Sequence, residues 1–189
     1  MGKVKLGKLV VVDLESTAWE NEDGTKTPPP GMRSDIIEIG ACHLDLQTGK
    51  ISQKTSYIIR PANSTMSPFI TELTTLTQED VNKGIPFTDA CNKFIKEFGT
   101  KSKVWASWGD YDRIHFQKDC DFYKARYPFN VKHINAKTLF SLVYGLRKEL
   151  GLRNAMEYLG LSFKGTQHRG HDDAFNIAKV LWKTLRRSQ

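Results

Sequence analysis

The first residues whose types and spacing could do chemistry are Asp13 and Glu15, directly after the apolar run 9–12. Residues two apart in a strand project from the same face, so these carboxylates would lie side by side. On a buried central strand they repel each other and need neutralising cations. Carboxylate oxygens suit Mg²⁺ or Mn²⁺ better than zinc. A solvated strand end is the alternative, which the preceding apolar run disfavours.

Two further segments place acidic groups at the expected start of a helix. Asp110 and Asp112 follow an apolar run at 104–106, and the sequence His-Arg-Gly-His-Asp-Asp occupies residues 168–173. Acidic residues in the first turn commonly cap a helix or interact with its dipole. Each segment taken alone therefore has a structural interpretation, and residues 168–173 could also be a metal-binding surface tract.

The elements that must position these side chains alternate between strand and helix patterns. Strands are expected at 9–14, 36–44, 50–59 and 104–106. Helices are expected as short pieces within 61–84, one opening at Thr77, and then at 87–98, from 112, at 136–145, at 152–159 and at 172–187. Residues 21–34, with three consecutive prolines, are expected to form a surface loop. This order predicts an α/β sheet covered by helices.

Composition limits the classes of protein to which the chain could belong. With 28 Lys and Arg against 21 Asp and Glu, the net charge is +7, which favours a polyanionic partner or serves solubility alone. No apolar run approaches the length of a membrane helix, which is about 20 residues. The three cysteines are widely spaced, which favours a reducing compartment. Without a repeat or a linker, residues 1–189 are expected to form a single cytoplasmic domain with no membrane partner.

The three acidic segments, in this order along the chain, resemble the DEDDh family of 3′–5′ exonucleases. The opening Asp-Leu-Glu-Ser-Thr-Ala-Trp at 13–19 is similar to that of the Eri-type subgroup, which trims RNA 3′ ends. Further similar segments are Ile-Ile-Glu-Ile-Gly-Ala at 36–41, Glu-Leu-Thr-Thr-Leu-Thr-Gln at 72–78, Ser-Trp-Gly-Asp-Tyr-Asp at 107–112 and Gly-His-Asp-Asp-Ala-Phe-Asn-Ile-Ala at 170–178. The resemblance covers nearly the whole chain. It implies a ribonuclease H-like mixed β-sheet flanked by α-helices.

The resemblance also implies roles for particular residues. Two divalent cations, Mg²⁺ or Mn²⁺, would be held by four carboxylates, and His168 would be the general base. The four carboxylates are Asp13, Glu15, Asp112 and Asp173. The aromatic residue before Asp112 favours it over Asp110, and the family's His-to-Asp spacing favours His168 with Asp173 over His171 or Asp172.

Residues near the strand end are expected to touch the terminal nucleotide. These are Leu14 and Thr17, whereas Trp19 could either stack on a base or simply pack. The chain departs from the family pattern at Ala18, where Cys is usual, and at Thr75, where Gly is usual. Both departures bear on inherited substrate preference and leave the four carboxylates intact.

The implied activity is metal-dependent 3′–5′ exonuclease action on the 3′ ends of single-stranded RNA or DNA, with RNA favoured. The products would be nucleoside 5′-monophosphates. Two alternatives stay open: a DNA-directed or oligonucleotide-directed enzyme of the same superfamily, and a nucleic-acid-binding domain without catalysis. The complete set of acidic residues and histidine disfavours the second alternative.

Overall fold

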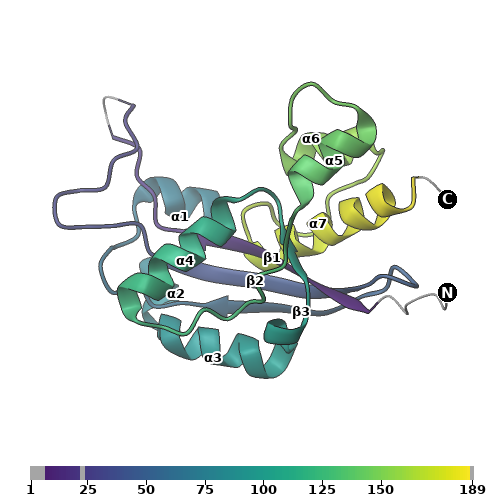
Figure 1. Ribbon diagram of the computed structural model, residues 1–189. Helices are drawn as coiled ribbons and strands as arrows, with labels where there is room; N and C mark the ends of the chain where they lie inside the picture. Colours follow the sequence, from purple (N-terminus) through teal and green to yellow (C-terminus); the bar gives the residue numbers. More distant parts are fainter. Residues whose placement is uncertain (1–6, 22–23, 188–189) are drawn as a thin grey trace.

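The computed structural model describes residues 7–21 and 24–187 of the chain and is built around one mixed β-sheet (Figure 1). Its five strands lie in the order β3-β2-β1-β4-β5. Their bounds are β1 Lys8–Ser16, β2 Ile36–Asp45, β3 Ile51–Ile58, β4 Trp105–Ser107 and β5 His133–Asn135. β1 pairs antiparallel with β2 and parallel with β4, so it is the central strand.

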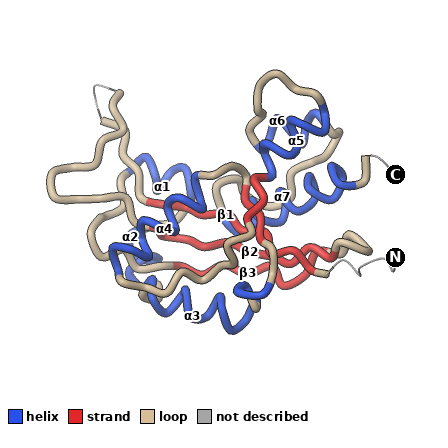
Figure 2. The backbone as a smooth tube through the Cα atoms, viewed as in Figure 1, coloured by secondary structure: helices blue, strands red, loops and turns tan. Residues whose placement is uncertain are grey.

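Helices cover both faces of the sheet (Figure 2). Their bounds are α1 Pro68–Thr74, α2 Gln78–Asn82, α3 Phe87–Phe98, α4 Tyr111–Tyr123, α5 Ala136–Tyr144, α6 Leu152–Tyr158 and α7 Gly170–Leu185, with a 3₁₀ turn at Thr100–Ser102. No helix of the described part of the chain is long and apolar enough to cross a membrane.

The side chains of β1 alternate between two hydrophobic layers. Val10, Val12 and Leu14 pack with α3 and α4 on one face of the sheet. Leu9 and Val11 pack with α5 and α7 on the other face. Because a strand repeats every two residues, Asp13 and Glu15 continue the row of Leu9 and Val11 on the α7 face.

Most of the expected elements are present within one or two residues of their expected bounds. Thr77 caps α2 through a reciprocal capping box with Asp80, and α3 ends at Gly99, whose φ of 61° closes the helix. β5 is not among the strands expected from the sequence. This strand has only three residues, all half-buried, and it forms through parallel pairing with β4, so no local pattern marks it.

Candidate active site

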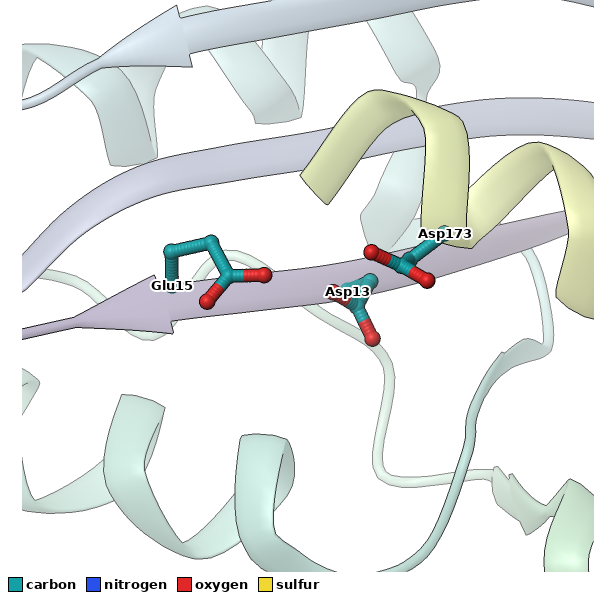
Figure 3. A group of neighbouring side chains, drawn as sticks. All are labelled: Asp13, Glu15 and Asp173. Carbon is teal, nitrogen blue, oxygen red and sulfur yellow. The ribbon is translucent and has the colours of Figure 1, made fainter. Parts of the chain in front are cut away.

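Three carboxylates meet on the α7 face of the central strand. Asp13 and Glu15 project from β1, and Asp173 points toward them from the first turn of α7 (Figure 3). One carboxylate oxygen from each residue lies within 4.8 Å of the corresponding oxygens of the other two. The fold thus brings Asp173 to Asp13 and Glu15, although it lies at least 158 positions from them in the chain.

Asp112 joins this group because β4 is short. β4 pairs with β1 only at Val10 and Val11, which leaves the later part of β1 without a strand on that side. There the backbone N–H of Leu14 donates to Oδ1 of Asp112, at 3.0 Å, from the first turn of α4. The carboxylate cluster, as we call Asp13, Glu15, Asp112 and Asp173, lies around one open cavity of about 250 Å³. Its lining residues are Asp13, Leu14, Glu15, Trp108, Tyr111, Asp112, Leu152, His168 and Asp173.

Two glycines set how closely α7 approaches the sheet. A Cβ at Gly40 of β2 would lie 1.7 Å from the backbone carbon of Gly170. A Cβ at Gly170 would in turn lie 3.0 Å from the backbone oxygen of Asp13. Since neither residue has a side chain, the first turn of α7 rests directly on β1 and β2. This contact carries Asp173 to Asp13.

Burial and mutual repulsion act on the protonation of the carboxylate cluster. The pKa of Asp13 is raised well above its ordinary value, first by burial and then by the charges of the neighbouring acids. Burial and the Asp173 charge likewise raise the pKa of Glu15. Burial raises the pKa of Asp112 to about 6 and that of Asp173 to about 7. The ionised cluster is therefore unfavourable unless cations neutralise it.

The residues fit a divalent metal ion. Within residues 7–21 and 24–187, no lysine, arginine or histidine forms an ion pair with the carboxylate cluster. Oδ2 of Asp173 is buried and has no hydrogen-bond partner among the described residues. A buried oxygen of this kind normally has a partner, and a set made only of carboxylate oxygens is the donor set of hard cations such as Mg²⁺ and Mn²⁺.

Asp110 and Asp172, the alternatives to Asp112 and Asp173 in the sequence, both have partners within the protein. Asp110 accepts hydrogen bonds from Arg113 and from Asn135, and it is half exposed. Asp172 pairs with Lys54 of β3 and accepts from the backbone N–H of Thr166 at 2.8 Å. Hydrogen bonds from Lys54 and Thr166 outweigh burial, so the pKa of Asp172 is lowered. Neither residue lines the cavity of the cluster.

The two histidines of the last motif are separated in the same way. His168 is exposed on the turn before α7 and lines the cavity of the carboxylate cluster. Burial lowers its pKa, so the imidazole is neutral near pH 7. His171 instead contacts Glu38, with 3.1 Å between its Nδ1 and Oε1 of Glu38.

Comparison with known proteins gives the family. The exonuclease family model, RNase_T, matches residues 10–181, which is most of the chain. The chain belongs to this exonuclease family. Mouse ERI1 exoribonuclease 2 is 30% identical over 94% of the chain and 28% of the relative's length. The Drosophila melanogaster 3′-5′ exonuclease Snipper is 28% identical over 94% of the chain and 69% of its own length. Human 3′-5′ exoribonuclease 1 is 30% identical over 94% of the chain and 52% of its own length.

Solved structures of exonucleases share the fold. The nuclease domain of 3′hExo, a DEDDh family member bound to rAMP, superposes with a TM-score of 0.84 and 28% identity, covering 98% of the chain and 94% of that domain. The expected resemblance to DEDDh, Eri-type exonucleases and the expected ribonuclease H-like fold are therefore confirmed. The chain spans about a quarter to two thirds of the length of these curated relatives.

Two expected substrate contacts do not reach the cavity in this exonuclease domain. Thr17 is 1% exposed, and its hydroxyl is engaged by the backbone of Asp35 and by Ser64. Of the two roles left open for Trp19, packing agrees with its position, because only 8% of the residue is exposed and it belongs to the buried interior. Leu14 does line the cavity, although its side chain packs with α3 and α4.

The structure adds cavity residues that sequence reasoning did not single out. Tyr111 is 59% exposed at the cavity, and its hydroxyl lies 3.0 Å from both Ser16 Oγ and His115 Nδ1. Leu152 reaches the cavity from the start of α6. Tyr111 stands between the two aspartates of its motif, which was a usable signal, whereas nothing near Leu152 in the sequence marks it.

The two departures from the family pattern, Ala18 and Thr75, do not line the cavity. Thr75 ends α1 with φ of 63°, the left-handed region that a glycine adopts without strain. Ala18 packs against a separate hydrophobic cluster that includes Ile70 and Leu76. Both changes therefore act on the segment around α1 and leave the carboxylate cluster untouched.

Proposed function

We propose that this domain is a metal-dependent 3′–5′ exonuclease that releases nucleoside 5′-monophosphates from the 3′ end of single-stranded nucleic acid. The supporting observation is the carboxylate cluster itself. Four acids from three distant segments surround one open cavity, none of them ion-paired to a described cationic residue, and a neutral histidine lines its rim. Such an arrangement is costly to fold and useful only when divalent ions and a phosphate enter it.

We assign Asp13, Glu15, Asp112 and Asp173 to hold two divalent cations, Mg²⁺ or Mn²⁺. When bound, such ions activate water and stabilise the negative charge that develops on the phosphate and the leaving oxygen. The chain's own contribution is to keep four carboxylates in one place by the pairing of β1, the first turn of α4 and the glycine contact under α7.

His168 is the proposed general base for the attacking water. Its lowered pKa keeps the ring unprotonated near neutral pH, which a proton acceptor requires. The ring lines the same cavity as the carboxylates, and its exposure leaves it open to an incoming strand. Leu14 would border the terminal nucleotide, while Asp112 stays oriented by the backbone N–H of Leu14.

RNA is the favoured substrate in this proposal. Relatives at 28–30% identity are named exoribonucleases or a 3′-5′ exonuclease, and the structure of a 3′-exonuclease that recognises the 3′ end of a histone mRNA stem-loop superposes with a TM-score of 0.85 at 25% identity. The net charge of +7 suits any nucleic acid. A DNA-directed or oligonucleotide-directed enzyme is the second candidate.

One assay tests the activity and separates the candidates. Purified protein is incubated with 5′-labelled single-stranded RNA or DNA in Mg²⁺, Mn²⁺ or EDTA. A ladder that shortens from the 3′ end with metal, faster on RNA and absent in EDTA, is expected. Preference for DNA would select the second candidate, and a shifted but uncut RNA band would instead indicate a binding domain without catalysis. The Asp13→Asn variant controls for contaminating nuclease.

We further propose that residues 1–189 act as one exonuclease domain and that the compartment is reducing, as in the cytoplasm. The match to the family model at 10–181 supports the first proposal. Three buried cysteines, all with free thiols, support the second. Cell fractionation with an antibody against the chain tests the compartment.

A further inference from the structure

A fifth acidic side chain lies beside the carboxylate cluster. Glu38 of β2 stands opposite Glu15 in the β1–β2 register and is 0% exposed. Its Oε1 accepts a hydrogen bond from Ser56 of β3 at 2.6 Å, and its Oε2 accepts one from Nε of Arg169 at 3.0 Å. With His171 also at Oε1, both oxygens of Glu38 are occupied by protein groups.

Glu38 therefore differs from a metal ligand. Hydrogen bonds from Ser56, His171 and Arg169 outweigh its burial and lower its pKa, which is opposite to the behaviour of Asp13 and Glu15. It does not line the cavity. What Glu38 holds is the segment on either side of the α7 start, namely Arg169 before the helix and His171 within it.

His168 directly precedes that segment in the chain. His168 has φ of 59°, a left-handed conformation that a non-glycine residue keeps only when its surroundings enforce it. Among the described residues, no hydrogen bond to its ring fixes the side chain. The next residue, Arg169, occupies the N-cap position of α7 without capping it, since a guanidinium has no acceptor atom, and its side chain pairs with Glu38 instead.

We propose that Glu38, acting through Arg169, is a positioning residue for His168. The ion pair anchors the strained turn to the sheet, and the turn directs the imidazole into the cavity. This inference rests on the proposed function, in which His168 takes the proton of the attacking water. Arg169 could alternatively pair with a substrate phosphate or stabilise the fold only, and the two alternatives predict different kinetics.

A double-mutant cycle distinguishes these roles. kcat and KM are measured on 5′-labelled single-stranded RNA at saturating Mg²⁺ for the wild type, Arg169→Ala, His168→Ala and the double variant. Arg169→Ala is expected to lower kcat by about ten- to a hundredfold with KM within about twofold, because a misdirected base costs turnover and not binding. In the His168→Ala background the same change is expected to alter kcat by less than about twofold.

Controls keep the result decisive. Ser56→Ala releases Glu38 from the β3 side without altering α7, and is expected to lower kcat by about threefold only when His168 is present. Lys93→Ala removes an exposed ion pair with Glu97 on α3 and is expected to leave kcat unchanged. Titration calorimetry with Mn²⁺ alone is expected to show the same affinity for Arg169→Ala and the wild type.

Three results would overturn the inference. They are an equal loss of kcat from Arg169→Ala in both backgrounds, a rise in KM without a fall in kcat, and a loss of Mn²⁺ binding. If Arg169→Ala fails to fold, judged by its thermal transition, the Ser56→Ala cycle decides in its place. Failure of the proposed function is a separate outcome, since the wild type itself would then leave RNA uncut.

Discussion

Two neighbouring residues of α7, Asp172 and Asp173, show two ways in which this molecule treats a buried acid. Asp172 faces Lys54 and the Thr166 backbone, and its pKa is lowered. Asp173 faces Asp13 and Glu15, has one oxygen with no hydrogen-bond partner in the described part of the chain, and has its pKa raised to about 7. Burial is similar, at 6% and 9% exposed, so the difference lies in the partners.

The same contrast separates the carboxylate cluster from Glu38 across the β1–β2 pair. Acids that the protein satisfies by itself, Glu38 and Asp172, stabilise the ends of the strands and the start of α7. The acids of the carboxylate cluster form no ion pair with the residues that the structure describes, and their repulsion is a cost that a bound cation can offset. The missing partner, more than burial, therefore marks the candidate site.

The largest expected difference in activity is between a variant of a cluster acid and a variant of an acid that has protein partners. Asp13→Asn is expected to reduce exonuclease activity by about 10⁴-fold or more, since a metal ligand supporting several kcal/mol of transition-state stabilisation is lost. Its fold is expected to survive, because the change relieves repulsion. Asp172→Asn should retain activity within about tenfold but unfold at a lower temperature, because Lys54 loses its partner. Rates on labelled RNA and thermal unfolding check both, and the reverse pattern would refute the contrast.

The start of α4 offers a second matched pair. Asp112→Asn is expected to lower the rate by about 10³-fold, as Asp112 belongs to the carboxylate cluster. Asp110→Asn is expected to stay within about threefold, since this half-exposed residue only joins Arg113 and Asn135 at the surface. Equal losses in the labelled-RNA assay, or the opposite ranking, would show that the second motif uses the other aspartate.

The two histidines test the same boundary with a smaller effect. His168→Ala is expected to slow turnover by about a hundred- to a thousandfold while Mn²⁺ still binds, because general-base catalysis is lost and the ligands remain. It should also remove the acid limb of the pH–rate profile, which burial places below the ordinary pKa of 6.5. His171→Ala should cost less than about tenfold, since Arg169 still holds Glu38. An equal loss of turnover from His171→Ala would show that His168 is not the general base.

The sequence predicts the features of the fold and of the candidate site that depend on neighbouring residues, and not those that depend on residues far apart in the chain. The period of two in a strand predicts that Asp13 and Glu15 share a face, and helix periodicity predicts α3 and α7. By contrast, the approach of α7 needs the contact between Gly40 and Gly170, which are 130 positions apart, and no local pattern announces it.

The sequence also does not predict which side chains surround each acid. Asp172 and Asp173 are equally plausible ligands by type, and only the positions of Lys54 and Asp13 in the fold assign their environments. The sequence left open whether Trp19 stacks on a base or packs in the interior, and only the fold shows that it is buried. The family resemblance supplied the residue pairs that local patterns left open, because it carries tertiary information that one sequence lacks.

The smallest expected effect is on the pH dependence of stability, which the raised pKa values of the cluster acids determine. Asp112 and Asp173 titrate near 6 and 7 when folded, against 3.8 for a free side chain, so the folded metal-free protein retains protons that the unfolded chain releases. Their contribution to stability is therefore present below pH 4 and lost as the pH rises toward 7. Saturating Mn²⁺ at pH 7.5 should raise the unfolding temperature by about 5–10 °C over EDTA, and by much less in Asp13→Asn. Calorimetric scans from pH 5 to pH 8 check this, and equal shifts in the two proteins would mean that the ion binds outside the carboxylate cluster.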